Sequence, residues 1–189
     1  IDGTNTFEMA GKLVGIMGLG NIGQKGARRV QAFDAAVQYY DIAPQTPARE
    51  RELNVKRVSR EELFRTSDII SLHAPLTNDT RHVVNRARLA TMKPSAILVN
   101  TSRGEVVDET ALYEALRDKR IAGAGLDVFE QEPIDPANPL LKLDNVVVSP
   151  HTAGTTWDTW FRRAEFAYAN MKRVWAGEPP QSVATDYDL

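Results

Sequence analysis

The sequence of 189 residues predicts an α/β fold in which helices cover both faces of a doubly wound, mostly parallel β-sheet. Three observations support this prediction. Short apolar runs of strand type alternate with helix-type segments along most of the chain. A glycine-rich turn, residues 18–23, joins the first apolar run to the first helical segment. Polar side chains follow several later apolar runs, at the end of a parallel strand where such sheets bind ligands.

The glycine-rich turn has the surroundings of a dinucleotide-binding βαβ unit, which a glycine triplet alone would not establish. Residues 12–17 are strand-like, residues 21–33 are compatible with a helix, and residues 37–40 form a second strand that ends at Asp41. The alternative is an ordinary glycine turn without a ligand, and the full context disfavours it. The segment therefore predicts a Rossmann-type unit.

Each glycine of the turn has its own role in this interpretation. Gly18 permits the tight turn, Gly20 lets the backbone approach a pyrophosphate, and Gly23 lets the helix pack closely on the strand. The helix N-terminus offers unpaired N–H groups and the positive end of its dipole to the phosphates.

Asp41 indicates NAD rather than NADP as the cofactor. A carboxylate at the end of the second strand accepts hydrogen bonds from ribose hydroxyls and repels a 2′-phosphate. No Arg or Lys follows it directly, and Arg49 and Arg51 could help only if their loop folded back. Alternatively, Asp41 is a solvated acid at a strand end.

The remaining elements alternate in order along the chain. We expect further strands at residues 55–58, 68–72 (stopped by Pro75), 95–100, 122–126 and 145–149. We expect helices at residues 59–65, where Ser59 and Glu62 form a capping box, at 109–119, and from Thr155 or Thr156 to a point before Gly177.

The last predicted helix carries a broad aromatic stripe with spacings of three and four residues. Its members are Trp157, Trp160, Phe161, Ala164, Tyr168, Met171 and Trp175. We expect this stripe to be buried, in a core or an interface, rather than to bind a cofactor.

Composition predicts a soluble, cytoplasmic globule. With 42% hydrophobic residues the chain can bury a substantial core. A net charge of −2 gives no footprint for nucleic acid or an anionic membrane surface. Cysteine is absent, so disulfides and thiolate metal sites are excluded, and we predict no metal site. No apolar run approaches the ~20 residues needed to span a bilayer. A first residue that is Ile rather than Met indicates processing or a fragment.

Three polar residues follow predicted strands: Arg103, Glu132 and His151. Taken singly they could be a surface cation, a solvated acid and a residue at a helix start. Taken together they form a usable set. An Arg binds a carboxylate through two parallel hydrogen bonds. A His exchanges a proton with a carbonyl or hydroxyl oxygen, and a neighbouring carboxylate stabilises its protonated form.

Several motifs in order resemble the D-isomer-specific 2-hydroxyacid dehydrogenases, over about residues 7–177. They are Val14–Gly23, His73–Thr77, Met92–Gly104, Val107–Asp108, Gly125–Pro133 and Pro150–Gly154. The resemblance implies hydride transfer between NAD(H) and a 2-oxo or 2-hydroxy acid, with Arg103 as carboxylate clamp, His151 as acid/base and Glu132 as its partner. Besides the three glycines, it implies cofactor contacts at Asn21, Ile22, Asp41, Pro75, Thr101, Asp127 and Gly154.

The same resemblance implies that a second, substrate-binding domain is largely missing, because family members carry roughly a hundred residues before this region. We therefore expect a hinge remnant at residues 1–8, the dinucleotide-binding domain at 9–177, and an extended tail at 178–189. Alone, the chain would bind NAD without turnover and would associate as a homodimer. An NAD(H)-sensing module akin to corepressor relatives is the alternative function.

Overall fold

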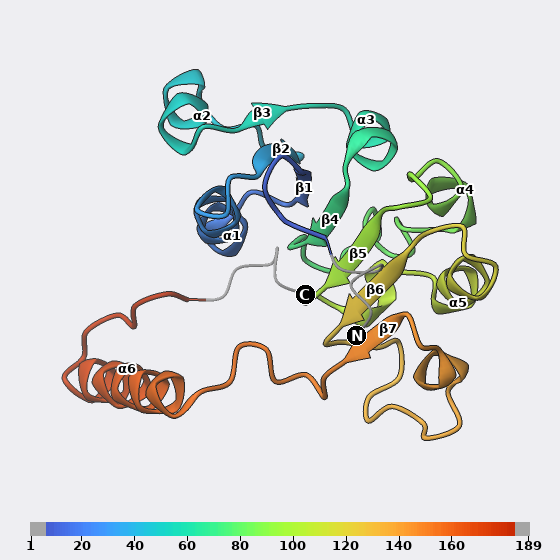
Figure 1. The fold of residues 1–189 in the computed structure, drawn as a ribbon. Helices are drawn as coiled ribbons and strands as arrows, with labels where there is room; N and C mark the ends of the chain where they lie inside the picture. Colours follow the sequence, from blue (N-terminus) through green and yellow to red (C-terminus); the bar gives the residue numbers. More distant parts are fainter. Residues whose placement is uncertain (1–6, 184–189) are drawn as a thin grey trace. The chain divides into compact units, whose positions relative to one another are not determined.

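The computed structural model describes residues 7–183. By its internal contacts the chain divides into two compact units, residues 1–150 and residues 151–189. Figure 1 shows a sheet with helices in the first unit and one long helix in the second. The division predicted from the sequence, at residues 8 and 177, stays a prediction, and most of the expected hinge remnant and half of the expected tail lie outside the described residues.

The first unit is built on a seven-stranded sheet in the order β3-β2-β1-β4-β5-β6-β7. Every neighbouring pair is parallel, which confirms the predicted doubly wound sheet. The strands are β1 Leu13–Met17, β2 Ala36–Tyr40, β3 Lys56–Arg57, β4 Ile69–Leu72, β5 Ile97–Asn100, β6 Gly123–Leu126 and β7 Val146–Val148. The strand order reverses between β1 and β4, and ligands bind outside the carboxyl ends of the strands at such a point.

Helices cover the sheet from two sides, with α1 and α2 on one and α3, α4 and α5 on the other (Figure 1). Their bounds are α1 Asn21–Gln31, α2 Pro47–Leu53, α3 Arg60–Thr66, α4 Arg86–Leu89 and α5 Glu109–Arg117, with short 3-10 turns at Gly104–Val106 and Pro139–Lys142. Each layer has its own apolar core. Tyr39 and Leu53 belong to the first, and Phe64, Leu98 and Leu112 belong to the second.

Local capping explains where the helices begin. The Ser59 hydroxyl accepts a hydrogen bond from the Glu62 N–H at 3.1 Å, as the predicted capping box requires of Ser59. The helices α2 and α4 were not predicted. Thr46 caps α2 and Pro47 occupies its first turn, so a Thr-Pro start signal was present in the sequence.

Asp68 ties together the amino ends of three strands. One carboxylate oxygen accepts a hydrogen bond from the Leu13 N–H at 2.8 Å, and the other pairs with the Lys93 ammonium at 2.7 Å. The Asp68 carbonyl accepts a further bond from the Ile97 N–H. Partial burial disfavours the charged form, but the Leu13 hydrogen bond and Lys93 outweigh it and lower the pKa of Asp68.

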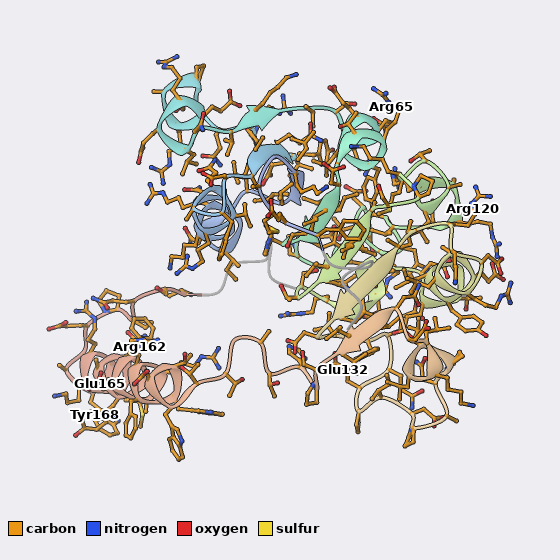
Figure 2. All side chains as sticks on the ribbon, in the orientation of Figure 1. Arg65, Arg120, Glu132, Arg162, Glu165 and Tyr168 are labelled. Carbon is orange, nitrogen blue, oxygen red and sulfur yellow. The ribbon has the colours of Figure 1, made fainter. Side chains whose placement is uncertain are left out.

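The second unit contains α6, Trp157–Trp175, which Thr156 caps at its N-terminus. The predicted helix is therefore present. Its stripe is not buried within this chain, and its burial in an interface stays a prediction. Trp157, Trp160 and Phe161 are 80%, 59% and 63% exposed, and no residue of α6 is buried. Figure 2 labels Arg162, Glu165 and Tyr168 along the same helix. The spacing identified an amphipathic helix correctly, but spacing carries no information about what covers its apolar face. None of the described helices is long and apolar enough to cross a membrane.

We predict that two neighbouring residues of β5 respond very differently to truncation. Leu98 is 0% exposed in the core beneath α3–α5, whereas Ile97 points to the opposite face and is 38% exposed. Leu98→Ala should lower the free energy of unfolding by about 3 kcal/mol, and Ile97→Ala by less than about 1 kcal/mol. Urea unfolding followed by circular dichroism measures both. Equal losses would contradict this placement of β5.

We predict that Asp68 stabilises the fold only above acid pH. Because its pKa is lowered in the folded state, its contribution is present above the unfolded value of about 3.9 and disappears as the pH falls through the folded value. The melting temperature of Asp68→Asn should therefore lie below that of the wild type at pH 7, and this difference should shrink between about pH 4 and pH 2. Asp34→Asn, an exposed change, is the control. A difference independent of pH would contradict the lowered pKa of Asp68.

Candidate cofactor and catalytic site

The glycine turn after β1 is built from backbone contacts that exclude a side chain. Gly18 has a φ of 94°, and a Cβ there would lie 2.8 Å from the Ala74 nitrogen. A Cβ on Gly23 would overlap the Gly18 carbonyl, so α1 lies directly on the turn. These contacts explain why both positions are glycine.

Gly20 differs from the other two glycines because its Cβ position meets no protein atom within 4 Å. It forms the N-cap of α1, which has no side-chain cap hydrogen bond, and Asn21 and Ile22 in the first turn are exposed. The helix N–H groups are thus open to a ligand. An anionic group fits here, because the helix dipole is positive at this end.

His73, the residue after β4, is bonded to the end of β1, just before the glycine turn. Its N–H donates to the Met17 carbonyl at 2.7 Å, and its ring shares a 2.9 Å hydrogen bond with the Ser71 hydroxyl. Burial lowers the pKa of His73. A neutral imidazole is therefore favoured behind the glycine turn at physiological pH.

Asp41, the residue after β2, also binds the backbone of the glycine turn. One of its carboxylate oxygens accepts a hydrogen bond from the Leu19 N–H at 2.7 Å, and the other accepts from the Ala43 N–H at 2.9 Å. The sequence indicated a role toward the cofactor or a solvated acid, and these bonds to the backbone were not predicted. The carboxylate thus fixes the Gly18–Gly20 segment and the start of the loop after β2 in one position.

A mainly apolar hollow lies beside this carboxylate. It brings together the predicted cofactor residues Gly18, Asp41 and Pro75 with Met17, Tyr40, Ile42, Arg60, Ala74, Thr77, Asp79 and Thr80. A pocket with apolar walls and a few polar groups is typical of small-molecule sites. Its position at the β1–β4 reversal fits the adenosine end of a dinucleotide.

The cations near Asp41 are not those considered from the sequence. Arg49 bonds to Glu52 and Gln24, and Arg51 is exposed on α2. Arg57, in β3, instead donates to the Asp41 backbone carbonyl at 3.4 Å. The Arg60 guanidinium lies over the Tyr40 ring, 5.7 Å from its centroid.

Arg103 is presented by a loop that Asn100 organises. The buried Asn100 side chain donates to the Arg103 carbonyl at 2.9 Å and accepts from the Ser102 N–H and hydroxyl. Thr101 and Arg103 remain exposed at the end of β5. Asn100 was not singled out from the sequence, although a polar residue at the end of an apolar strand was a usable signal.

Glu132 lies in the loop after β6, the strand beside β5 (Figure 2). One oxygen of its carboxylate accepts from the Phe129 N–H at 3.0 Å. At the start of the loop, buried Asp127 accepts a 2.5 Å hydrogen bond from Ser149, which joins the ends of β6 and β7. A Cβ on Gly104 would overlap the Phe129 carbonyl, so the Arg103 and Glu132 loops are in backbone contact.

His151 is the first residue of the second unit, so its approach to Arg103 and Glu132 stays a prediction. It is exposed and has a φ of 54°, a left-handed conformation that is uncommon for a residue other than glycine. Gly154 lies in the same exposed segment. Within residues 7–183, no group of three or more His, Asp or Glu side chains is placed to hold a metal ion.

Sequence comparisons identify relatives of the chain. Residues 2–153 match the family described as D-isomer specific 2-hydroxyacid dehydrogenase, NAD binding domain. The chain is 48% identical over 177 residues to a glyoxylate reductase of Korarchaeum cryptofilum, covering 94% of this chain and 53% of that protein. It is 48% identical over 151 residues to a hydroxypyruvate reductase of Thermotoga maritima, covering 79% and 48%.

A structural comparison agrees. The fold superposes on a D-lactate dehydrogenase with NAD+ from Lactobacillus jensenii with a TM-score of 0.87 and 32% sequence identity, covering 95% of this chain and 57% of that one. The chain thus spans about half the length of the curated relatives it matches. The family match over residues 2–153 confirms the resemblance drawn from the motifs. The chain belongs to the D-isomer-specific 2-hydroxyacid dehydrogenase family and carries its NAD-binding domain.

Proposed function

We propose that this chain forms the cofactor half of an NAD-dependent enzyme that interconverts 2-oxo acids and D-2-hydroxy acids. The observation that carries the proposal is the gathering of an open glycine turn, Asp41 and Arg103 at the carboxyl ends of parallel strands. This edge is where doubly wound sheets bind ligands.

In this proposal the chain's own residues bind the acid and move the proton. Arg103 holds the substrate carboxylate through its guanidinium group. His151 donates a proton to the carbonyl oxygen during reduction and accepts it during oxidation. Glu132 orients His151 and favours its protonated form. The glycine turn and Asp41 would hold NADH, which would supply the hydride for this reduction.

The names of the relatives suggest the substrate class. Glyoxylate reductases and a hydroxypyruvate reductase are similar to the chain, so we propose small 2-oxo acids as substrates. A second domain would contribute the rest of the substrate site and exclude water. The 189 residues alone should therefore bind NAD without appreciable turnover.

The expected homodimer remains part of the proposal. Its support is the exposed apolar side of α6, where Trp157, Trp160 and Phe161 lie within one helical turn. Exposed apolar patches of this kind favour association.

We predict that Arg103→Ala raises the KM for glyoxylate and lowers kcat in the full-length protein carrying these residues, by at least about tenfold in kcat/KM, because a charged hydrogen bond is worth about 1.5–3 kcal/mol. Arg103→Lys should recover only part of the loss, since an ammonium lacks the planar fork. Steady-state kinetics with NADH measures both. Arg65→Ala is the surface control, and wild-type kinetics for Arg103→Ala would refute the assigned role.

We predict that the chain binds NAD at least about tenfold more tightly than NADP, a difference of about 1.4 kcal/mol. Asp41→Ala should narrow this ratio by removing the charge that repels the 2′-phosphate. It should also weaken NAD binding, because the Leu19 and Ala43 N–H groups lose their acceptor. Calorimetric titration with both dinucleotides measures each effect. Equal affinities in the wild type would show that a cation such as Arg57 receives the phosphate.

A further inference from the structure

The segment before α4 runs beside the Arg103 loop. The His82 N–H donates to the Glu105 carbonyl at 2.7 Å, and the Val84 N–H donates to the Val106 carbonyl at 3.1 Å. Val84 and Val107 form a parallel bridge. The backbone of His82 is therefore bonded to Glu105, which lies two residues after Arg103 and directly after Gly104.

The His82 side chain reaches the other candidate loop. Its Nε2 atom lies 3.0 Å from a carboxylate oxygen of Glu130, two residues before Glu132. His82 has a φ of 49°, in the left-handed region. Such a backbone persists in a residue with a side chain only where surrounding contacts determine it. His82 thus connects the segment after Arg103 with the segment before Glu132.

Glu130 is held from a second direction by the start of α5. Its carboxylate accepts a hydrogen bond from the Glu109 N–H at 3.1 Å, and the Glu109 carboxylate accepts one from the Glu130 N–H. The other Glu109 oxygen accepts from the Asn138 side-chain amide at 3.0 Å. This reciprocal pair fixes both the backbone and the side chain of Glu130.

The held segment leads directly to Glu132. The Phe129–Glu130 peptide is in close contact with Gly104 on one side, and the Phe129 N–H donates to the Glu132 carboxylate on the other. A displacement of this peptide would move Glu132 relative to Arg103. The contacts made by His82 and Glu130 oppose that displacement.

We infer that His82 and Glu130 are positioning residues, which form a clamp that sets the place of Glu132 relative to Arg103. The inference rests on the proposed function, in which Glu132 orients His151. In this inference the clamp acts through the Phe129–Glu130 peptide, and not through a contact of its own with substrate or cofactor.

Exposure and charge indicate that the clamp contributes geometry more than stability. The His82 and Glu130 side chains are 45% and 36% exposed, and ion pairs at such positions add little to the stability of a fold. Two further charged groups lie on the same segments: Glu109 bonds to Glu130, and Arg81, next to His82 in the chain, pairs with Glu105 at 3.7 Å. A small displacement of a catalytic group can still cost up to about 100-fold in rate.

The test compares three variants in the full-length protein with glyoxylate and NADH. His82→Asn tolerates a left-handed backbone but is too short to reach Glu130. Glu130→Ala removes the carboxylate that contacts both His82 and the Glu109 N–H, whereas Glu130→Gln keeps an oxygen that can accept from the Glu109 N–H. We expect His82→Asn and Glu130→Ala to lower kcat about tenfold. Glu130→Gln should recover most of it. The NADH dissociation constant and the melting temperature should stay near the wild-type values.

The pH profile separates positioning from a merely structural role. If Glu132 is displaced, His151 loses support for its protonated form, and the alkaline limb of the reduction profile should move to lower pH in His82→Asn and Glu130→Ala. Arg81→Gln, on the same segment, should move neither kcat nor the limb. An equal effect of Arg81→Gln, or an unchanged kcat and profile in the clamp variants, would overturn the inference.

Glu132→Gln distinguishes this inference from the proposed function. If Glu132→Gln lowers kcat and moves the limb while His82→Asn and Glu130→Ala do not, the clamp is refuted and the proposed function stands. If Glu132→Gln itself leaves kcat and the profile unchanged, the assigned role of Glu132 fails, and the inference fails with it.

Discussion

The site depends on backbone contacts so close that they exclude a Cβ atom. Gly23 lies against the Gly18 carbonyl, and Gly18 lies against the His73–Ala74 peptide, so α1, β1 and β4 meet at the point where the strand order reverses. Gly104 makes an equivalent contact with Phe129 between the two loops proposed to carry chemistry. Because close-packed interiors cannot absorb an added methyl group without movement, these three glycines determine how near the loops approach one another.

Polar side chains then hold each loop in the shape that close packing allows. Asp41 binds the N–H groups of Leu19 and Ala43, and Asn100 binds the backbone around Arg103. The carboxylates of Glu109 and Glu130 do the same for the loop that carries Glu132. Polar side chains of this kind bond to the backbone, so the loops at the carboxyl edge are fixed without a regular sheet or helix of their own.

Most of the fold was predictable because strands and the longer helices have periodic, local signals. The short helix α2 was missed although Thr46 and Pro47 marked its start. The helical pattern did not determine the exposure of Trp157 and Trp160, since an amphipathic pattern is the same whether or not a partner covers it. In the site, glycines and strand-end acids had recognisable spacing. The His82–Glu130 contact joins residues that are 48 positions apart in the sequence, and no local sequence pattern indicates such a pair.

Backbone amide chemical shifts of the isotopically labelled chain during titration with NADH test the central claim most directly. The claim is that the dinucleotide lies at the carboxyl edge around the β1–β4 reversal. The account predicts the largest shift changes at Leu19–Gly23, at Asp41–Ala43 and at His73–Thr80, with small changes in α4 and α5. Largest changes in α4 and α5, or changes spread evenly along the chain, would contradict it.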